Sequence, residues 1–156
     1  TGGVSVGDYD FVRPVALKIG FEQLFWKVKQ KPGKPMFFAK SERPDQNPCY
    51  LLGLPGNPAA VYIAMQIYVS TLISTVQGQK QLPQWFSAVM SHDLKADSRE
   101  RFLRMALSFD SGMLKLSSLP KQQSHMLSNL MQANCIVRIP AAQSIQTGQI
   151  LQGLFI

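Results

Sequence analysis

One stretch constrains the fold more than any other: an apolar segment at 49–54, a P-G-N-P turn at 55–58 and an apolar run to Val76. This order predicts a buried strand, a tight turn and a helix, in which Asn57 is the N-cap and Pro58 takes the first helical position. A strand, a glycine-containing turn and a helix start form a geometry that binds anions. The same residues also suit an ordinary helix start, so the pattern alone leaves both interpretations open.

Upstream of this unit, the residue pattern predicts a loop, a helix and two strands. The first ten residues are rich in glycine and small polar groups, which is typical of a loop leaving a buried strand, so we expect the chain to begin inside a domain. A helix is expected from Phe11 to about Ile19, with Asp10 as its cap. Strands are expected at 24–29 and 36–39, around a rigid K-P-G-K-P loop at 31–35, with a turn at 41–48.

The apolar run ends in a polar stretch, 77–84, where the helical periodicity stops and a domain boundary is expected. The run itself contains Gln66 and several hydroxyl groups and is marginal in length for a membrane span, so we expect a buried helix. The second half alternates in the manner of strands, with a turn at 110–112 that favours a hairpin. Strands are expected at 85–90, 101–109, 113–117, 135–139 and 150–156, with a short helix at 124–131.

The charge and the cysteine content narrow the classes of partner. Sixteen Lys and Arg against nine Asp and Glu give a net charge of +7, which favours phosphate, nucleic acid or an oxyanion. Few aromatic residues interleave with the basic groups, so nucleic acid is the weaker interpretation. Cys49 and Cys135 lie far apart without a CxxC pair, which indicates neither a zinc site nor a disulfide framework and favours a reducing, cytoplasmic setting. With only two histidines, a bound metal would be hard and held by carboxylates, most simply Mg²⁺.

Three segments present backbone amides or cations to an anion: residues 2–10, 27–34 and 55–60. In the first, glycines at 2, 3 and 7 allow a close backbone approach, although a simple tight turn explains them equally well. Asp8 and Asp10 end this loop and suit either helix capping or metal and proton chemistry. In the second, Lys27, Lys29 and Lys31 alternate and are expected to share one strand face, which could also be simply solvated.

Taken together and in order, these segments resemble the MoeA/gephyrin family of molybdopterin molybdenumtransferases. T-G-G-V-S-V-G at 1–7 matches the family signature T-[ST]-G-G-V-S-x-G from its second residue. K-P-G-K-P at 31–35 and G-L-P-G-N-P at 53–58 match its next two landmarks. A weaker likeness continues through 101–104, 123–128 and 133–135, so the resemblance covers essentially the whole chain.

The resemblance implies a fold and a reaction. Residues 1–79 would be the latter part of an α/β, MogA-like molybdopterin-binding domain, and residues 80–156 a small β-barrel-like domain. The family enzyme inserts molybdate into adenylylated molybdopterin and releases AMP, with Mg²⁺ assisting. A homodimer is implied for the full-length protein, without a nucleic-acid or membrane partner. Because upstream parts of the family site lie outside these residues, we expect this chain alone to be inactive.

The resemblance also implies roles for particular residues. Asp10, Lys27 and Lys31 would be catalytic, and Asp8 and Asp10 would hold the metal. The substrate would be bound by Thr1, Gly2, Gly3, Ser5, Lys34, Gly56, Asn57, Pro58, Arg104 and Ser124. From the residues alone, Arg104 could also be a solvated strand residue and Ser124 a helix cap. One departure is that Ala59 and Ala60 stand where many relatives have a serine, so backbone amides would have to replace a hydroxyl.

Two other functions fit parts of the pattern. A MogA-type molybdopterin adenylyltransferase would share the first domain, but the K-P-G-K-P loop and the appended β-rich half argue against it. A scaffold or anion-binding module without catalysis is the second alternative. Molybdate-dependent release of AMP from adenylylated molybdopterin would separate the three.

Overall fold

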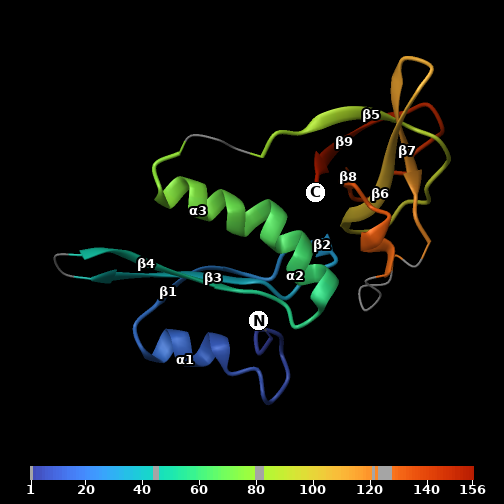
Figure 1. The fold of residues 1–156 in the computed structure, drawn as a ribbon. Coiled ribbons are helices and arrows are strands. Elements are labelled where there is room, and N and C mark those ends of the chain that lie inside the picture. The colour runs from blue at the N-terminus through green and yellow to red at the C-terminus, as the bar shows by residue number, and fades with distance from the viewer. Residues whose placement is uncertain (1, 44–45, 80–82, 121, 123–127) are drawn as a thin grey trace.

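The computed structural model describes residues 2–43, 46–79, 83–120, 122 and 128–156, in two units joined side by side (Figure 1). The first unit is a three-stranded antiparallel sheet in the order β1-β3-β4, with helices on both faces. Its strands are β1 (Glu22–Trp26), β3 (Phe37–Arg43) and β4 (Gln46–Gly53). The helix α1 (Val12–Lys18) covers one face, and a long helix made of α2 (Pro58–Ala64), the π-helical segment Met65–Val69 and α3 (Ser70–Val76) covers the other.

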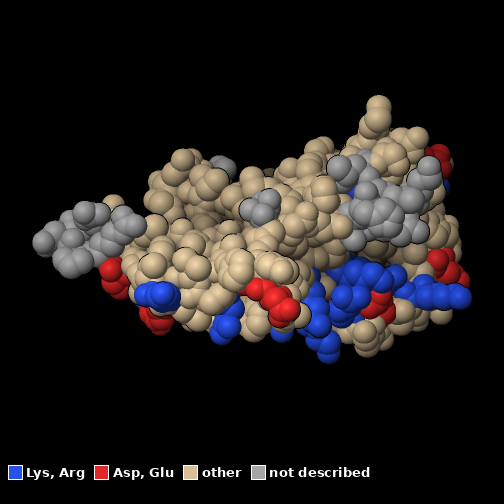
Figure 2. Space-filling model, turned by 90° about the horizontal axis from the view of Figure 1, so that it is seen from below, with Lys and Arg blue, Asp and Glu red and all other residues tan. Residues whose placement is uncertain are grey.

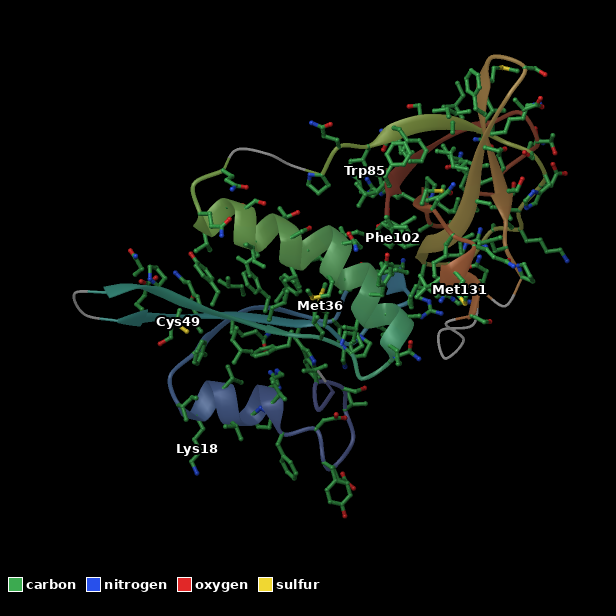
Figure 3. The ribbon with its side chains drawn as sticks, viewed as in Figure 1. Lys18, Met36, Cys49, Trp85, Phe102 and Met131 are labelled. Atoms are coloured by element: carbon green, nitrogen blue, oxygen red, sulfur yellow. The ribbon has the colours of Figure 1, made fainter. Side chains whose placement is uncertain are left out.

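Side-chain alternation along β3 explains why the sheet is covered twice. Phe37 and Ala39 are buried with Val4 and Ala16, on the side of α1. Met36, which precedes the strand, is buried with Ala64 of α2 on the opposite side (Figure 3). A strand with apolar groups on both faces needs a cover on each face, because successive side chains point in opposite directions.

The long helix begins as the sequence predicts. Asn57 is its N-cap, with its Oδ1 accepting a hydrogen bond from the Ala60 N–H at 3.3 Å, and Pro58 occupies the first turn. The expectation of a buried helix is confirmed for α2, where four residues are buried. It is wrong for α3, which has no buried residue and in which Ile73 and Val76 are 49% and 63% exposed. By length and composition alone Pro58–Val76 could cross a membrane, but a helix packed on a protein core passes the same test.

Two local predictions in the first unit are partly wrong. The strand expected at 24–29 ends at Trp26, because Lys27 turns the chain with a φ of 69°. The turn expected at 41–48 is mostly strand: β3 and β4 form a hairpin in which Ser41 pairs with Cys49. The tip of that hairpin, 44–45, lies outside the described residues.

The second unit is a closed, barrel-like sheet, as expected from its succession of short strands. Its strands are β5 (Phe86–Met90), β6 (Glu100–Asp110), β7 (Met113–Ser118), β8 (Cys135–Ile139) and β9 (Ile150–Phe155). They pair in the order β6-β7-β5-β9-β8, and β8 pairs with β6 again, which closes the ring. The β6–β7 hairpin turns at Ser111 and Gly112, whose φ values of 51° and 79° suit the tight turn predicted there. The predicted fold class, a partial α/β domain followed by a small barrel-like domain, is therefore confirmed.

Parts of the second unit lie outside the described residues. The unit was expected to start at 80, which falls within 80–82, and these residues are not described. Of the helix expected at 124–131, only a 3₁₀ turn at Ser128–Met131 is described. Both cysteines are free thiols, and Cys135 is buried.

A strand from the first unit joins the two halves. The short β2 (Gln30–Lys31) pairs in parallel with β6 of the barrel, with Lys31 opposite Arg101. Beside it, Ile63 of α2, Phe102 of β6 and Ile136 of β8 form one buried apolar cluster. Figure 3 shows Phe102 at the junction of the two units. This contact fixes the K-P-G-K-P loop, which follows β2, at the boundary between the units.

Candidate functional site

A cleft of about 840 Å³ lies at the junction of the two units. It brings together two of the three segments predicted to meet an anion, the K-P-G-K-P loop and the P-G-N-P turn, and adds residues from the barrel. Its lining consists of Lys31, Pro32, Gly33, Lys34, Pro35, Pro55, Gly56, Asn57, Ala60, Leu94, Arg99, Arg101, Phe102, Leu103, Ser118 and Gln122.

The charge of this lining has one sign. Lys31 and Lys34 come from the loop, and Arg99 and Arg101 from the barrel, while no Asp or Glu belongs to the lining residues. Figure 2 shows Lys and Arg gathered on one face of the molecule on the barrel side. Four cations around one hollow raise the local concentration of anions and suit a doubly charged oxyanion better than a neutral ligand.

The third predicted segment, the glycine loop at 2–10, lies beside the cleft at Gly2. The Gly2 N–H donates to the Leu54 carbonyl at 2.9 Å, so the loop begins alongside the end of β4. A Cβ added at Gly56 would lie 3.4 Å from the Gly2 Cα, so the loop and the P-G-N-P turn pack backbone against backbone. The glycine loop itself does not belong to the cleft lining, and Gly3 and the exposed Ser5 lie beyond this contact.

This packing makes Gly53 a sensitive position. A Cβ at Gly53 would lie 2.6 Å from the Val4 Cγ1, which is closer than two carbon atoms can approach. We expect Gly53→Ala to displace the glycine loop and to destabilise the fold by about 1–3 kcal/mol, measured by thermal unfolding. Adding Val4→Ala removes the overlapping methyl group and should recover part of the loss. An unchanged melting temperature in Gly53→Ala would contradict this packing.

The expectation that Lys27, Lys29 and Lys31 share one strand face is wrong, because the strand ends at Trp26 and, of these three, Lys31 alone lines the cleft. Because Lys27 turns the chain, its side chain folds back and its Nζ lies 4.0 Å from the Trp26 ring centroid. The guanidinium of Arg13 also lies over this ring, at 4.3 Å. Such cation–π contacts hold both cations on the indole. Lys27 is absent from the cleft lining, and Lys29 is also exposed outside it.

The two carboxylates of the glycine loop lie apart from the cleft. Asp10 was expected to cap α1, and this is wrong. The N-cap is Phe11, and no side chain forms a capping hydrogen bond with the helix start. Instead, the Asp10 Oδ2 accepts a hydrogen bond from the Gly7 N–H at 2.7 Å and closes the loop on itself. Asp8 is exposed. Within the described residues, no group of three or more His, Cys, Asp and Glu could enclose a metal.

The helix start offers fewer free amides than its sequence suggests. Pro58 has no N–H, and the Ala60 N–H is bound by the side chain of its own N-cap, Asn57. The Val61 N–H donates to the Asn57 carbonyl at 2.9 Å. In the described part of the chain, this leaves the Ala59 N–H as the first-turn amide without an acceptor. The cleft therefore offers an anion more from its four cations than from the helix start.

Arg104 lies inside the protein. Its side chain is 2% exposed, so the alternative of a solvated strand residue is wrong. Arg104 is not among the residues that line the cleft, and a contact with substrate stays a prediction. Burial lowers the pKa of its guanidinium below the ordinary value. Its backbone N–H and carbonyl are both bonded by the Gln122 side chain, at 3.3 and 2.5 Å. Thr1 and Ser124 lie outside the described residues.

The structure adds cleft residues that the sequence interpretation did not select. Arg101 and Ser118 line the cleft, and the Arg101 Nε and the Ser118 Oγ are buried with no hydrogen-bond partner among the described residues. Buried polar groups usually have a partner, so these two atoms suit a polar ligand. The alternation of side chains along β6 could have separated Arg101 from Arg104. The two residues are three positions apart, so their side chains point to opposite faces of the strand and do not both face the cleft.

Comparison with known proteins assigns both units. Residues 1–75 match the family described as probable molybdopterin binding domain, and residues 87–154 match the MoeA C-terminal region (domain IV). The chain is 38% identical over 141 residues to a molybdopterin molybdenumtransferase of Haemophilus influenzae, which covers 88% of this chain and 33% of the relative. It is 33% identical over 147 residues to the molybdenum cofactor synthesis protein cinnamon of Drosophila melanogaster, covering 92% of this chain and 24% of that protein.

The solved structures agree on the fold. A molybdopterin biosynthesis MoeA protein from Pyrococcus horikoshii superposes with a TM-score of 0.72 at 21% identity, over 94% of this chain and 34% of that one. The chain thus spans about a third of the Haemophilus and Pyrococcus proteins. The two family matches follow in the order of the two units, and the similarity extends over most of the chain. This chain therefore belongs to the MoeA family of molybdenum cofactor biosynthesis, and its two units match the molybdopterin-binding domain and domain IV of that family.

Proposed function

We propose that this chain forms part of the active site of a molybdopterin molybdenumtransferase, which inserts molybdate into adenylylated molybdopterin and releases AMP. The observation that carries the proposal is the junction cleft, in which Lys31, Lys34, Arg99 and Arg101 meet without a carboxylate in the lining. The name of the Haemophilus relative supports the same reaction. Because the chain spans about a third of that relative, the remaining substrate contacts belong to other parts of the family protein.

The cleft suits the charges of this reaction. Molybdate carries two negative charges, and cleavage of the adenylate develops further negative charge on phosphate oxygens. Fixed cations aimed at such charge stabilise the transition state, since they need no reorganisation when the reaction occurs. Lys31 and Lys34 would hold the oxyanion from the loop, with Gly56 and Asn57 forming the wall beside it. Pro58 is not a lining residue and would act by starting the helix behind this wall. Lys27 would contribute only after leaving the Trp26 ring.

The glycine loop would hold the phosphate end of the pterin and the metal. Mg²⁺ is commonly bound through one or two carboxylates together with substrate phosphates, and two carboxylates at one turn, Asp8 and Asp10, fit that donor set. Bound there, the ion would supply Lewis-acid stabilisation of phosphate oxygens. Asp10 is the catalytic carboxylate in this proposal, because its hydrogen bond from the Gly7 N–H holds it at a defined place.

Three further properties complete the proposal. The chain divides near residue 79, between the segments that match the two families. The full protein acts as a homodimer in the cytoplasm, as the family resemblance implies. Its partners are adenylylated molybdopterin and molybdate, and neither nucleic acid nor a membrane is among them.

Crystals of the full protein soaked in tungstate test the position of the oxyanion, because tungsten scatters X-rays strongly and tungstate has the shape and charge of molybdate. We expect density in the junction cleft, within hydrogen-bond reach of Lys31 and Lys34. Crystals of the Lys34→Ala variant, soaked in the same way, should show weaker density there. Density found only outside the cleft would overturn the assignment of the site.

A further inference from the structure

A carboxylate from the barrel, Asp97, forms ion pairs with two of the four cations that line the cleft. Asp97, which precedes β6, places its Oδ2 3.1 Å from the Lys31 Nζ. Its Oδ1 accepts a hydrogen bond from the Arg99 backbone N–H at 3.1 Å and lies 3.9 Å from the Arg99 Nε. Two of the four cations that line the cleft are therefore held by one acid that is not itself a lining residue.

Asp97 is fixed more firmly than the lysine it binds. The Asp97 side chain is 20% exposed, and its backbone carbonyl accepts a hydrogen bond from the Ala142 N–H at 2.7 Å. The Lys31 side chain is 54% exposed and ends a flexible four-carbon stem, so it can change partners at little cost. The hydrogen bonds from Arg99 and Lys31 lower the pKa of Asp97, so the carboxylate is charged at neutral pH.

Lys34 differs from Lys31 in this respect. It lines the same cleft from the same loop, yet it forms no ion pair with any described residue. In Figure 2, atoms of Asp or Glu lie inside the basic cluster on the barrel side of the molecule. Asp97 thus reduces the positive field of the cleft at Lys31, whereas no described carboxylate forms an ion pair that reduces it at Lys34.

We propose that Asp97 is an internal competitor for the oxyanion, whose carboxylate holds Lys31 and must release it when molybdate binds. This role rests on the proposed function of the cleft. Asp97 sets the affinity in two ways, since the incoming anion must exchange for an existing ion pair and then experiences the nearby negative charge. It also gives Lys31 a partner to return to when the anion leaves, which favours turnover over tight retention.

The sign of the expected effect is unusual for a residue next to a binding site, because removing Asp97 should strengthen binding. Asp97→Asn keeps the shape of the side chain and an acceptor for the Arg99 N–H but removes the charge. Titration of molybdate into the full protein at fixed ionic strength should show an affinity about three- to tenfold higher than in the wild type. In a Lys31→Ala background the same substitution should gain less, because the exchanged partner is gone.

Asp93→Asn is the matched control. Asp93 belongs to the same unit and accepts hydrogen bonds from the Thr147 N–H and hydroxyl, but it contacts none of the cleft cations. Its substitution changes the net charge equally and should leave the affinity for molybdate unchanged. An equal gain in Asp93→Asn, or an unchanged or weaker affinity in folded Asp97→Asn, would overturn the role of Asp97.

A measurement on the wild type does not depend on how the variant folds. In tungstate-soaked crystals the Lys31 Nζ should move beyond ion-pair distance of Asp97 and toward the anion, and a lysine that stays on Asp97 beside bound tungstate would refute the exchange. Different results would reject the proposed function itself, namely no binding of molybdate by the wild type, or equal binding by the wild type and Lys34→Ala. Loss of binding in Lys34→Ala without a gain in Asp97→Asn rejects only the inference about Asp97.

Discussion

Asp10→Asn in the full protein is expected to lower turnover about 100-fold or more while the melting temperature stays the same. The substitution removes the charge that would bind Mg²⁺ and assist proton transfer, and losses of this size are typical of such groups. Folding should be spared because an asparagine oxygen can still accept the hydrogen bond from the Gly7 N–H. Steady-state rates of AMP release and a thermal unfolding curve measure the two quantities.

The structure removes the main competing explanation for Asp10. Because Asp10 does not cap α1, a loss of activity in Asp10→Asn cannot be attributed to a damaged helix start. Asp10→Ala is a useful second variant, since it also removes the acceptor of the Gly7 N–H and should add a loss of stability. Turnover that is unchanged in Asp10→Asn would limit this residue to closing the glycine loop.

Lys34→Ala should weaken molybdate binding about 10- to 100-fold. Lys34 is the cleft lysine without an ion pair among the described residues, so its charge is available to the anion at no exchange cost. A charge-assisted hydrogen bond to an oxyanion contributes roughly 1.5–3 kcal/mol, which corresponds to this range. Titration calorimetry with molybdate measures the affinity, and the KM for molybdate should rise more than kcat falls.

Lys29→Ala is the matched control for Lys34→Ala. Lys29 is an exposed lysine five residues upstream, and it does not line the cleft. The two variants lose the same charge, so a difference between them reports position and not net charge. Equal affinities of the wild type and Lys34→Ala for molybdate would show that the oxyanion does not bind in this cleft.

Much of the fold follows from local patterns in the sequence. Asn57 and Pro58 could be assigned to the helix start because capping and the fixed φ of proline are local properties. The barrel strands were placed within a few residues, since short alternating segments separated by turns leave few other arrangements. The closure of the ring through β6 and β8 depends on contacts between distant residues, which no local pattern contains.

The site was harder to predict, for reasons seen in particular residues. Lys27 was expected beside Lys31, but its positive φ ends the strand and two cations share the Trp26 ring. Arg104 was selected on its family position, whereas Arg101 lines the cleft because alternation along β6 sends the two guanidinium groups to opposite faces. Asp97 could not be found from spacing, since 66 residues separate it from Lys31.

The family also limits the alternative functions. A MogA-type adenylyltransferase shares only the first unit, whereas residues 87–154 match the MoeA C-terminal region and supply half of the cleft cations. A scaffold or passive anion-binding module would need the cleft but no chemistry at the glycine loop. Binding measurements alone do not separate such a module from an enzyme, so the decisive measurement must follow a bond that breaks.

That measurement is the release of AMP from adenylylated molybdopterin by the full protein, followed with and without molybdate in the presence of Mg²⁺. The account predicts release that depends on molybdate, that falls sharply in Asp10→Asn and that needs more molybdate in Lys34→Ala. AMP release that proceeds equally without molybdate, or no release by a folded full protein with all three components, would contradict the proposal that this cleft serves a molybdenumtransferase.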